Sequence, residues 1–179
     1  MRPIEAAVIG PPLKETLELL SGSTDTATIT RLTNAFTQAY DGGGLNATTA
    51  YEGVTTMLER LAGAGIELHI ATNKRLHPTE CILELFGWRP LFASVYALDM
   101  VSPRLPDKAS MIARLLDTQA VDRQQAAYVG DRREDGEAAN ANSLAFFAAT
   151  WGYGALGVDE LEPGWMILPT PDPLRLQNG

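Results

Sequence analysis

The sequence has little cysteine and few basic residues, and each shortage excludes a class of protein. Cys81 is the only cysteine among 179 residues, which excludes a disulfide framework or a metal cluster of thiolates. We therefore expect a reducing, cytoplasmic setting. Only 14 lysines and arginines stand against 22 acidic residues, giving a net charge of −8. Because nucleic-acid binding needs a basic face, we expect no nucleic-acid partner.

Long apolar runs and repeats are also absent. No stretch approaches the roughly 18 uninterrupted apolar residues of a membrane span, and the first residues lack the order of a signal peptide. We therefore expect no membrane partner. What is present is a hydrophobic content of 45%, which suffices for one core, or for one core with a small appendage.

From residue 66 onward, short apolar runs alternate with helical patterns, which is typical of a parallel sheet flanked by helices. The predicted strands cover residues 66–71, 94–98, 126–129 and 144–149, with an edge strand at 165–168. The predicted helices between them cover residues 78–86, 106–116 and 134–142. The expected fold class is α/β, with a doubly wound parallel sheet.

The first third of the chain has a different pattern. Residues 13–20, 29–40 and 54–61 show helical spacing, with no clear pair of strands. We predict a small helical subdomain over about residues 11–48, and divide the chain into 1–48 and an α/β core over 49–179. The glycine run at 42–44 serves either as a hinge or as a loop, and the loop is favoured.

Polar groups follow three of the predicted strands. Thr72 and Asn73 offer a hydroxyl and backbone N–H donors for phosphate oxygens after the first strand. Lys108 starts the helix after the second strand and offers a compact cation. Asp131 and Asp135 follow the third strand and offer hard oxygen ligands for Mg²⁺. The order predicts one phosphate and metal site.

Each group also has a structural interpretation. Thr72 and Asn73 are common in turns and helix caps, and an isolated lysine such as Lys108 is usually solvated. Asp131 can cap the following helix, and Asp135 can lie near its positive end. Their joint occurrence at successive strand ends favours the site.

These residues resemble motifs two, three and four of the haloacid dehalogenase superfamily, in its phosphoglycolate-phosphatase-like branch. The matching segments are Thr72-Asn73-Lys74, Arg104-Leu105-Pro106-Asp107-Lys108, and Gly130-Asp131 with Asp135. Residues 9–13, 51–54 and 151–154 resemble the cap, the return to the core and the loop after motif four. The resemblance implies a Rossmann-like core with a small helical cap, which is incomplete here.

The resemblance also implies roles for the matching residues. Thr72 and Lys108 would be catalytic, and Thr72, Asn73 and Lys108 would bind the phosphoryl group of a small phosphorylated metabolite. Asp131 would bind Mg²⁺ directly, and Asp135 would be a ligand or a partner of the ligand. In this family the cap selects the organic part of the substrate.

The family's nucleophile is the first aspartate of an Asp-x-Asp-Gly motif, which ends a central strand, and its second aspartate is the general acid and base. No such motif occurs in the 179 residues. Asp25 and Asp41 are the only aspartates before residue 66, and neither follows an apolar run. We therefore expect turnover by this chain to be impaired, because the metal and the donors alone bind or weakly polarise a phosphate.

In the family the nucleophile strand lies between the strand that ends at Thr72 and the strand that ends before Asp131. Residues 4–9 either supply this central strand or form a cap helix that begins near Pro3, and the helix is favoured. Three hypotheses follow: a phosphatase whose nucleophile segment lies upstream, a degenerate protein that binds Mg²⁺ and a phosphorylated ligand, or an interaction module. In the third, a partner or a second copy fills the incomplete sheet.

Overall fold

The computed structural model describes residues 11–154 and 156–177. The two interpretations of residues 4–9 lie outside this part of the chain. The strands are β1 (Leu68–Thr72), β2 (Phe92–Ala97), β3 (Ala127–Gly130), β4 (Ala145–Ala149) and β5 (Met166–Leu168). The α-helices are α1 (Leu13–Ser21), α2 (Thr26–Asp41), α3 (Val54–Gly63), α4 (Leu76–Leu85), α5 (Lys108–Thr118), α6 (Arg133–Ala141) and α7 (Pro173–Gln177). Short 3₁₀ turns are η2 (Gly44–Ala47), η3 (Arg89–Leu91), η4 (Arg123–Gln125) and η5 (Val158–Glu160).

The predicted α/β class is confirmed, and local capping explains where the element ends differ from the sequence prediction. The first strand starts at Leu68 rather than at residue 66, because Gly65, with a φ of 79°, closes α3 and the Ile66 amide still bonds to Leu61. Helix α5 starts at Lys108 because the Asp107 side chain accepts the Ser110 amide at 2.7 Å and so forms the N-cap.

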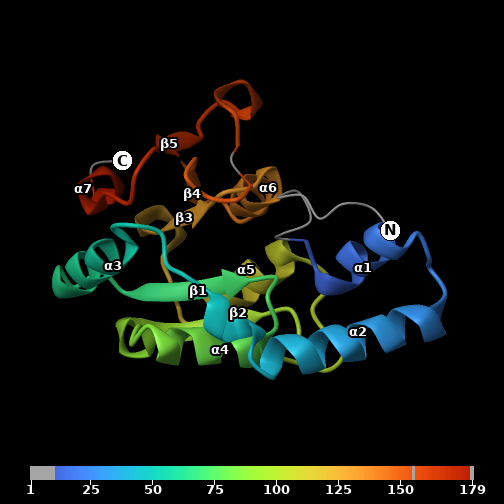
Figure 1. Cartoon of the computed structure of the whole chain (residues 1–179). Coiled ribbons are helices and arrows are strands. Elements are labelled where there is room, and N and C mark those ends of the chain that lie inside the picture. Colours follow the sequence, from blue (N-terminus) through green and yellow to red (C-terminus); the bar gives the residue numbers. More distant parts are fainter. Residues whose placement is uncertain (1–10, 155, 178–179) are drawn as a thin grey trace.

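The strand pairs are parallel, but among the described residues they form two sheets rather than one. β1 pairs with β2, and β4 lies between β3 and β5, with β5 at an edge as predicted. Figure 1 shows β1 and β2 as one pair and β3 and β4 as another. No described strand lies between β1 and β3, so the expected doubly wound sheet is divided at that place.

One hydrophobic core joins the two sheets. Helix α5 contributes Met111 and Ile112, both almost fully buried, and contacts β1, β2 and α6. The core cluster takes its other buried residues from α5, α6, β2, β4 and the segments next to the strands: Tyr96, Leu98, Leu115, Leu116, Ala138, Ala139, Leu144, Phe146, Ala148, Leu156 and Trp165. Because the cluster is continuous, the two sheets are held by shared packing rather than by backbone pairing.

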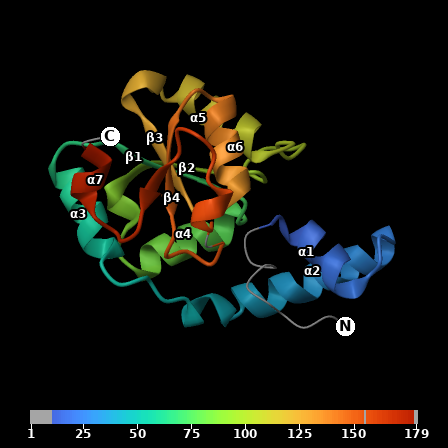
Figure 2. The same cartoon turned by 90° about the horizontal axis from the view of Figure 1, so that it is seen from above.

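Helices α1 and α2 pack against each other and lie to one side of the sheets (Figures 1 and 2). Two contacts tie the end of α2 to the segment after β1. Arg75 makes a bidentate ion pair with Asp41, at 2.6 and 3.0 Å, and the Lys74 ammonium donates to the Tyr40 hydroxyl at 2.9 Å. The division of the chain at residues 48 and 49 stays a prediction.

Within the described part of the chain, we find no helix whose length and apolar character would let it cross a membrane.

The shared core predicts a large cost for removing Phe146, which is 1% exposed and contacts Trp165 edge to face. Phe146→Ala should lower the free energy of unfolding by about 3–5 kcal/mol, because it removes apolar contacts and leaves a cavity. Leu19→Ala, at a position that is 48% exposed on α1, should cost less than about 1 kcal/mol. Urea unfolding of both variants measures the difference, and equal costs would contradict the assignment of the core.

Candidate functional site

The segments that follow β1 and β3 meet at one edge of the molecule. The Asn73 side-chain amide, just after β1, donates to Glu134 Oε1 at 2.6 Å, and Glu134 lies in the first turn of α6, after β3. The Lys108 ammonium, at the start of α5, lies 3.8 Å from the same Glu134 oxygen. Two of the predicted positions, Asn73 and Lys108, therefore converge on Glu134, a residue that the sequence did not single out.

Asp135 holds this edge together. Its side chain is 5% exposed, and one oxygen forms an ion pair with the Lys108 ammonium. The other oxygen accepts the backbone amides of Asp131 and Arg132, each at 3.0 Å. Since both oxygens have protein partners, Asp135 fits the role of a support for Asp131 better than the role of a direct metal ligand.

Asp131 lies under the loop that follows β4. Its Oδ2 accepts the Gly154 amide at 2.7 Å, whereas Oδ1 has no hydrogen bond to the described residues. The loop approaches closely because residue 152 is glycine: a Cβ at this position would overlap the Asp131 side chain. In the same way, a Cβ at Gly130 would overlap Asp135. Small residues thus let the backbone enclose both carboxylates.

A magnesium ion fits this arrangement through Asp131. Mg²⁺ commonly takes one or two carboxylates from the protein and keeps several waters. Asp131 Oδ1 provides one such oxygen, while no group of three His, Cys, Asp or Glu side chains suited to a metal occurs among the described residues. The donor set therefore suits a hydrated Mg²⁺ held by one carboxylate and not a closed cage of protein ligands.

Thr72 closes the turn after β1. Its hydroxyl oxygen accepts the Lys74 amide at 3.1 Å, so the turn interpretation of this residue holds in the structure. The hydroxyl hydrogen remains a donor, because accepting the amide uses only a lone pair. The structure thus places Thr72 beside Asn73 at the converging edge, and the catalytic and binding roles of these residues stay predictions.

Aromatic residues border Asp131 on the side of the β4 loop. The rings of Tyr51 and Trp151 meet edge to face at 5.2 Å, and Tyr153 lies 5.8 Å from Tyr51. Burial, the Tyr153 hydroxyl and the Asp131 carboxylate raise the pKa of Tyr51. The phenol therefore stays neutral beside the carboxylate.

Tyr128, which the sequence analysis did not single out, connects β3 to β1. Its hydroxyl donates to the Ala71 carbonyl at 2.9 Å. Burial, and then the carboxylates of Asp135, Glu134 and Asp131, raise the pKa of Tyr128, so the hydroxyl keeps its proton. The apolar run 126–129 does not predict this contact, because the contact joins residues of two different sheets.

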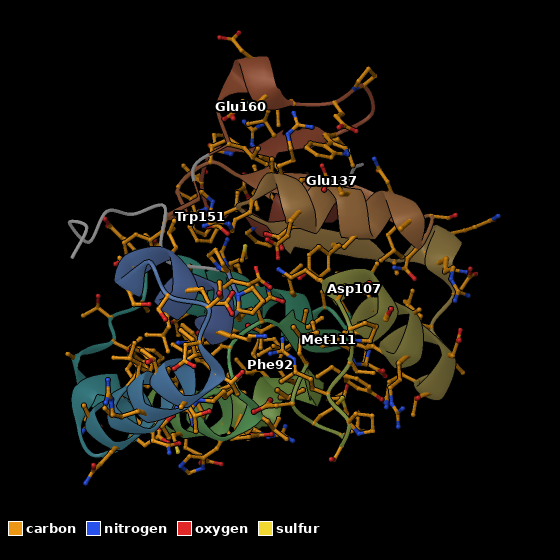
Figure 3. All side chains as sticks on the ribbon, turned by 90° about the vertical axis from the view of Figure 1, so that its right-hand side faces the viewer. Phe92, Asp107, Met111, Glu137, Trp151 and Glu160 are labelled. Atoms are coloured by element: carbon orange, nitrogen blue, oxygen red, sulfur yellow. The ribbon has the colours of Figure 1, made fainter. Side chains whose placement is uncertain are left out.

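A pocket of about 330 Å³ opens beside Asn73 and Lys108. Pro12 and Glu15 line it from the side of α1, and Asp107 and Glu137 line it from α5 and α6, where Figure 3 labels them. The remaining lining residues are Leu98, Pro106, Ala109, Glu134 and Ala138.

The chain is similar to known proteins over most of its length. Residues 5–149 match the family model of haloacid dehalogenase-like hydrolases. A phosphoglycolate phosphatase of Rhodospirillum rubrum is 34% identical over 163 residues, which cover 85% of this chain and 67% of that protein. A phosphoglycolate phosphatase of Psychrobacter arcticus is 29% identical, over 84% of this chain and 63% of that protein. The chain thus spans about two thirds of the length of these two relatives.

A solved structure shows the same fold. The crystal structure of a predicted phosphatase from Clostridium acetobutylicum superposes with a TM-score of 0.84. The match covers 96% of this chain and 79% of that one, at 24% sequence identity.

The N-cap that places Lys108 predicts a pH-dependent contribution to stability. The amide of Ser110 lowers the pKa of Asp107 below its usual value of 3.8, so the ionised carboxyl stabilises the fold. This stability is present above that value and is lost as the pH falls through the lowered pKa. Asp107→Ala should cost about 1 kcal/mol at neutral pH and much less at a pH below the lowered pKa. Urea unfolding at both pH values, with Asp117→Ala as the uncapped control in α5, tests this.

The Lys108–Asp135 ion pair predicts strong coupling in a double-mutant cycle. Asp135→Asn or Lys108→Met alone should cost about 3–5 kcal/mol, because each leaves a buried charge without its partner. The double variant should cost less than the sum, by about 2–3 kcal/mol. The exposed pair Arg133–Glu162 is the control, with an expected coupling below about 1 kcal/mol. Additive costs at Lys108 and Asp135 would show that the pair is not formed.

Proposed function

The chain belongs to the haloacid dehalogenase-like hydrolase family, and on this basis we propose that it binds a small phosphomonoester together with Mg²⁺ at the edge formed by Thr72, Lys108 and Asp131. The proposal rests on the contacts among Asn73, Lys108, Glu134 and Asp135. These contacts bring the segments that follow β1 and β3 together with the start of α5, beside one pocket. Similarity to phosphoglycolate phosphatases supports a phosphate ester as the ligand class.

Each residue has a defined task in this proposal. The Thr72 hydroxyl donates to a phosphoryl oxygen, and the backbone amides of the same turn add further donors. Lys108 offsets the negative charge of the phosphoryl group. Asp131 holds the Mg²⁺, which when bound would neutralise phosphate charge and orient the group. Asp135 keeps Lys108 and the Asp131 backbone in place.

We propose that phosphate release by these 179 residues is impaired. The Asp-x-Asp-Gly motif does not occur in the sequence, and the two aspartates of the first third are engaged elsewhere. Asp25 caps α2 by accepting the Thr28 amide at 2.8 Å, and Asp41 pairs with Arg75. Neither provides a nucleophile at the pocket.

The single cysteine, which is a free thiol, supports a cytoplasmic setting.

Calorimetric titration with inorganic phosphate and with phosphoglycolate, each with and without Mg²⁺, tests the proposal. Binding should require Mg²⁺, and Asp131→Asn should weaken the Mg²⁺-dependent binding by roughly tenfold or more. Asp117→Asn is the matched control, because the Asp117 side chain is 70% exposed on α5, and it should bind like the unmodified chain.

A phosphate-release assay under the same conditions separates binding from turnover. Release should be slow for the unmodified chain. Fast release would contradict impairment, and release that survives Asp131→Asn would contradict the proposed metal site. Binding that ignores Mg²⁺ would contradict the role of the ion.

A further inference from the structure

We propose that Ser94, His69 and Glu67 form a second, esterase-like site, in which Ser94 takes the acyl group of a small activated carboxylic ester. His69 and Glu67 lie at the amino end of β1, whereas Thr72 ends the strand at the opposite edge of the sheet. The proposal goes beyond the proposed function and does not depend on phosphate or Mg²⁺.

Two short contacts connect the three residues in series. The Ser94 hydroxyl oxygen lies 2.8 Å from His69 Nδ1, and His69 Nε2 lies 2.9 Å from Glu67 Oε1. Both distances are those of good hydrogen bonds. A nucleophile beside a base, which is itself oriented by a third group, is the arrangement that activates serine for covalent catalysis.

An irregularity in the strand pairing brings the serine to the histidine. β1 and β2 are parallel neighbours (Figure 1), and Leu68 pairs with Phe92. The next residue of β1, His69, pairs with Ser94, so Ala93 is skipped. Bulges are uncommon in parallel pairs, and they often re-aim a side chain next to an active site. In a regular register His69 would lie opposite an alanine, and the hydroxyl would not be available to it.

The charge of Glu67 determines where the protons lie. Its side chain is 64% exposed, and as a carboxylate at neutral pH it can only accept a hydrogen bond. In the neutral imidazole, His69 Nε2 therefore carries the proton and Nδ1 keeps its lone pair. The Ser94 hydroxyl must then donate to Nδ1, which makes His69 the base for this hydroxyl.

The burial and the position of Ser94 limit the substrate to small esters. The His69 side chain is 12% exposed and Ser94 is half-buried, so a bulky acyl group is excluded. Among the described strands, β2 pairs only with β1, and the N–H groups on its outer edge have no strand partner. Because N–H groups alternate between the two edges of a strand, we assign the oxyanion to the outward amides at or beside Ser94.

The proposed reaction has two steps. The Ser94 oxygen forms a bond to the carbonyl carbon, and the bond from that carbon to the leaving oxygen breaks. The hydroxyl proton passes to His69 Nδ1 and then to the leaving oxygen. Water next attacks the acyl-serine and gives a proton to His69, which returns it to Ser94 as the carboxylic acid leaves. The cycle consumes only ester and water.

Hydrolysis of 4-nitrophenyl acetate by the full chain, measured as 4-nitrophenolate release with a chelator present, tests the proposal. Ser94→Ala should reduce the rate to that of the buffer, and His69→Gln should lower it at least roughly tenfold. Ser23→Ala is the matched control for the serine, because Ser23 is also half-buried but its hydroxyl accepts the Asp25 amide. His77→Gln, at an exposed histidine, is the control for the base. Both controls should hydrolyse the ester like the unmodified chain.

Glu67→Gln separates the reaction from folding. The exposed side chain tolerates the change, so the midpoint of urea unfolding should stay the same. The ester rate should still fall about fivefold, because the neutral amide does not fix the proton at His69 Nε2 by its charge. Mg²⁺-dependent phosphate binding should be unchanged in Ser94→Ala and Glu67→Gln, so failure of either proposal is visible by itself.

The position of the acyl group decides the outcome. Mass spectrometry of peptides after brief reaction should find the acetyl group on Ser94, and a fluorophosphonate should label the same residue and block hydrolysis. An acetyl group on Cys81 or on lysines, with unchanged hydrolysis by Ser94→Ala, would overturn the proposal. Equal rates for His69→Gln and the unmodified chain would also overturn it, and the three residues would then be a structural hydrogen-bond chain.

Discussion

The site depends on Asp135, a carboxylate that is almost fully buried and has partners for both oxygens. It pairs with the Lys108 ammonium and accepts the amides of Asp131 and Arg132. A buried carboxylate without such partners would be too costly to keep ionised. These contacts fix three things at once: the start of α5, the turn after β3 and the backbone position of Asp131. The candidate metal ligand is thus held by hydrogen bonds to its main chain, which leaves its Oδ1 oxygen available.

The two sheets stay together although no described strand pairs them, because side chains of a shared hydrophobic core pack between them. Helix α5 supplies four buried side chains to a cluster that includes residues of β2 and β4. Apolar burial is non-directional, so it can hold two sheets together where no described strand pairs them. Tyr128 adds a directional contact across the division, and its raised pKa keeps the phenol protonated as a donor. Next to the division, β1 is half-buried along its length and β3 alternates between exposed and half-buried residues.

The sequence predicts the elements well where the pattern is local. Apolar runs and helical spacing place every strand within about two residues, and Asp131 and Lys108 lie at element ends as expected. The sequence does not predict that Asp131 is the candidate ligand and that Asp135 supports it. These roles depend on which carboxylate oxygen accepts which backbone amide. Glu134 was missed for a similar reason: an acidic residue in a first helical turn is common, and only the fold brings it to Asn73. The short helix α7 lies in a proline-rich tail with no helical spacing.

The charges at the pocket give a physical reason why phosphate binding here should require a cation. Asp131, Glu134 and Asp135 contribute three carboxylates, and the Lys108 ammonium contacts Glu134 and Asp135, so this group has an excess of negative charge. Asp107 and Glu137, which line the same pocket, increase the excess. A phosphomonoester brings about two further negative charges at neutral pH. Lys108 alone cannot offset these charges, because its ammonium already forms an ion pair with Asp135. In the proposed function, a divalent ion on Asp131 Oδ1 would add the positive charge that Lys108 does not supply, and the ion and the phosphate would then be mutually dependent ligands.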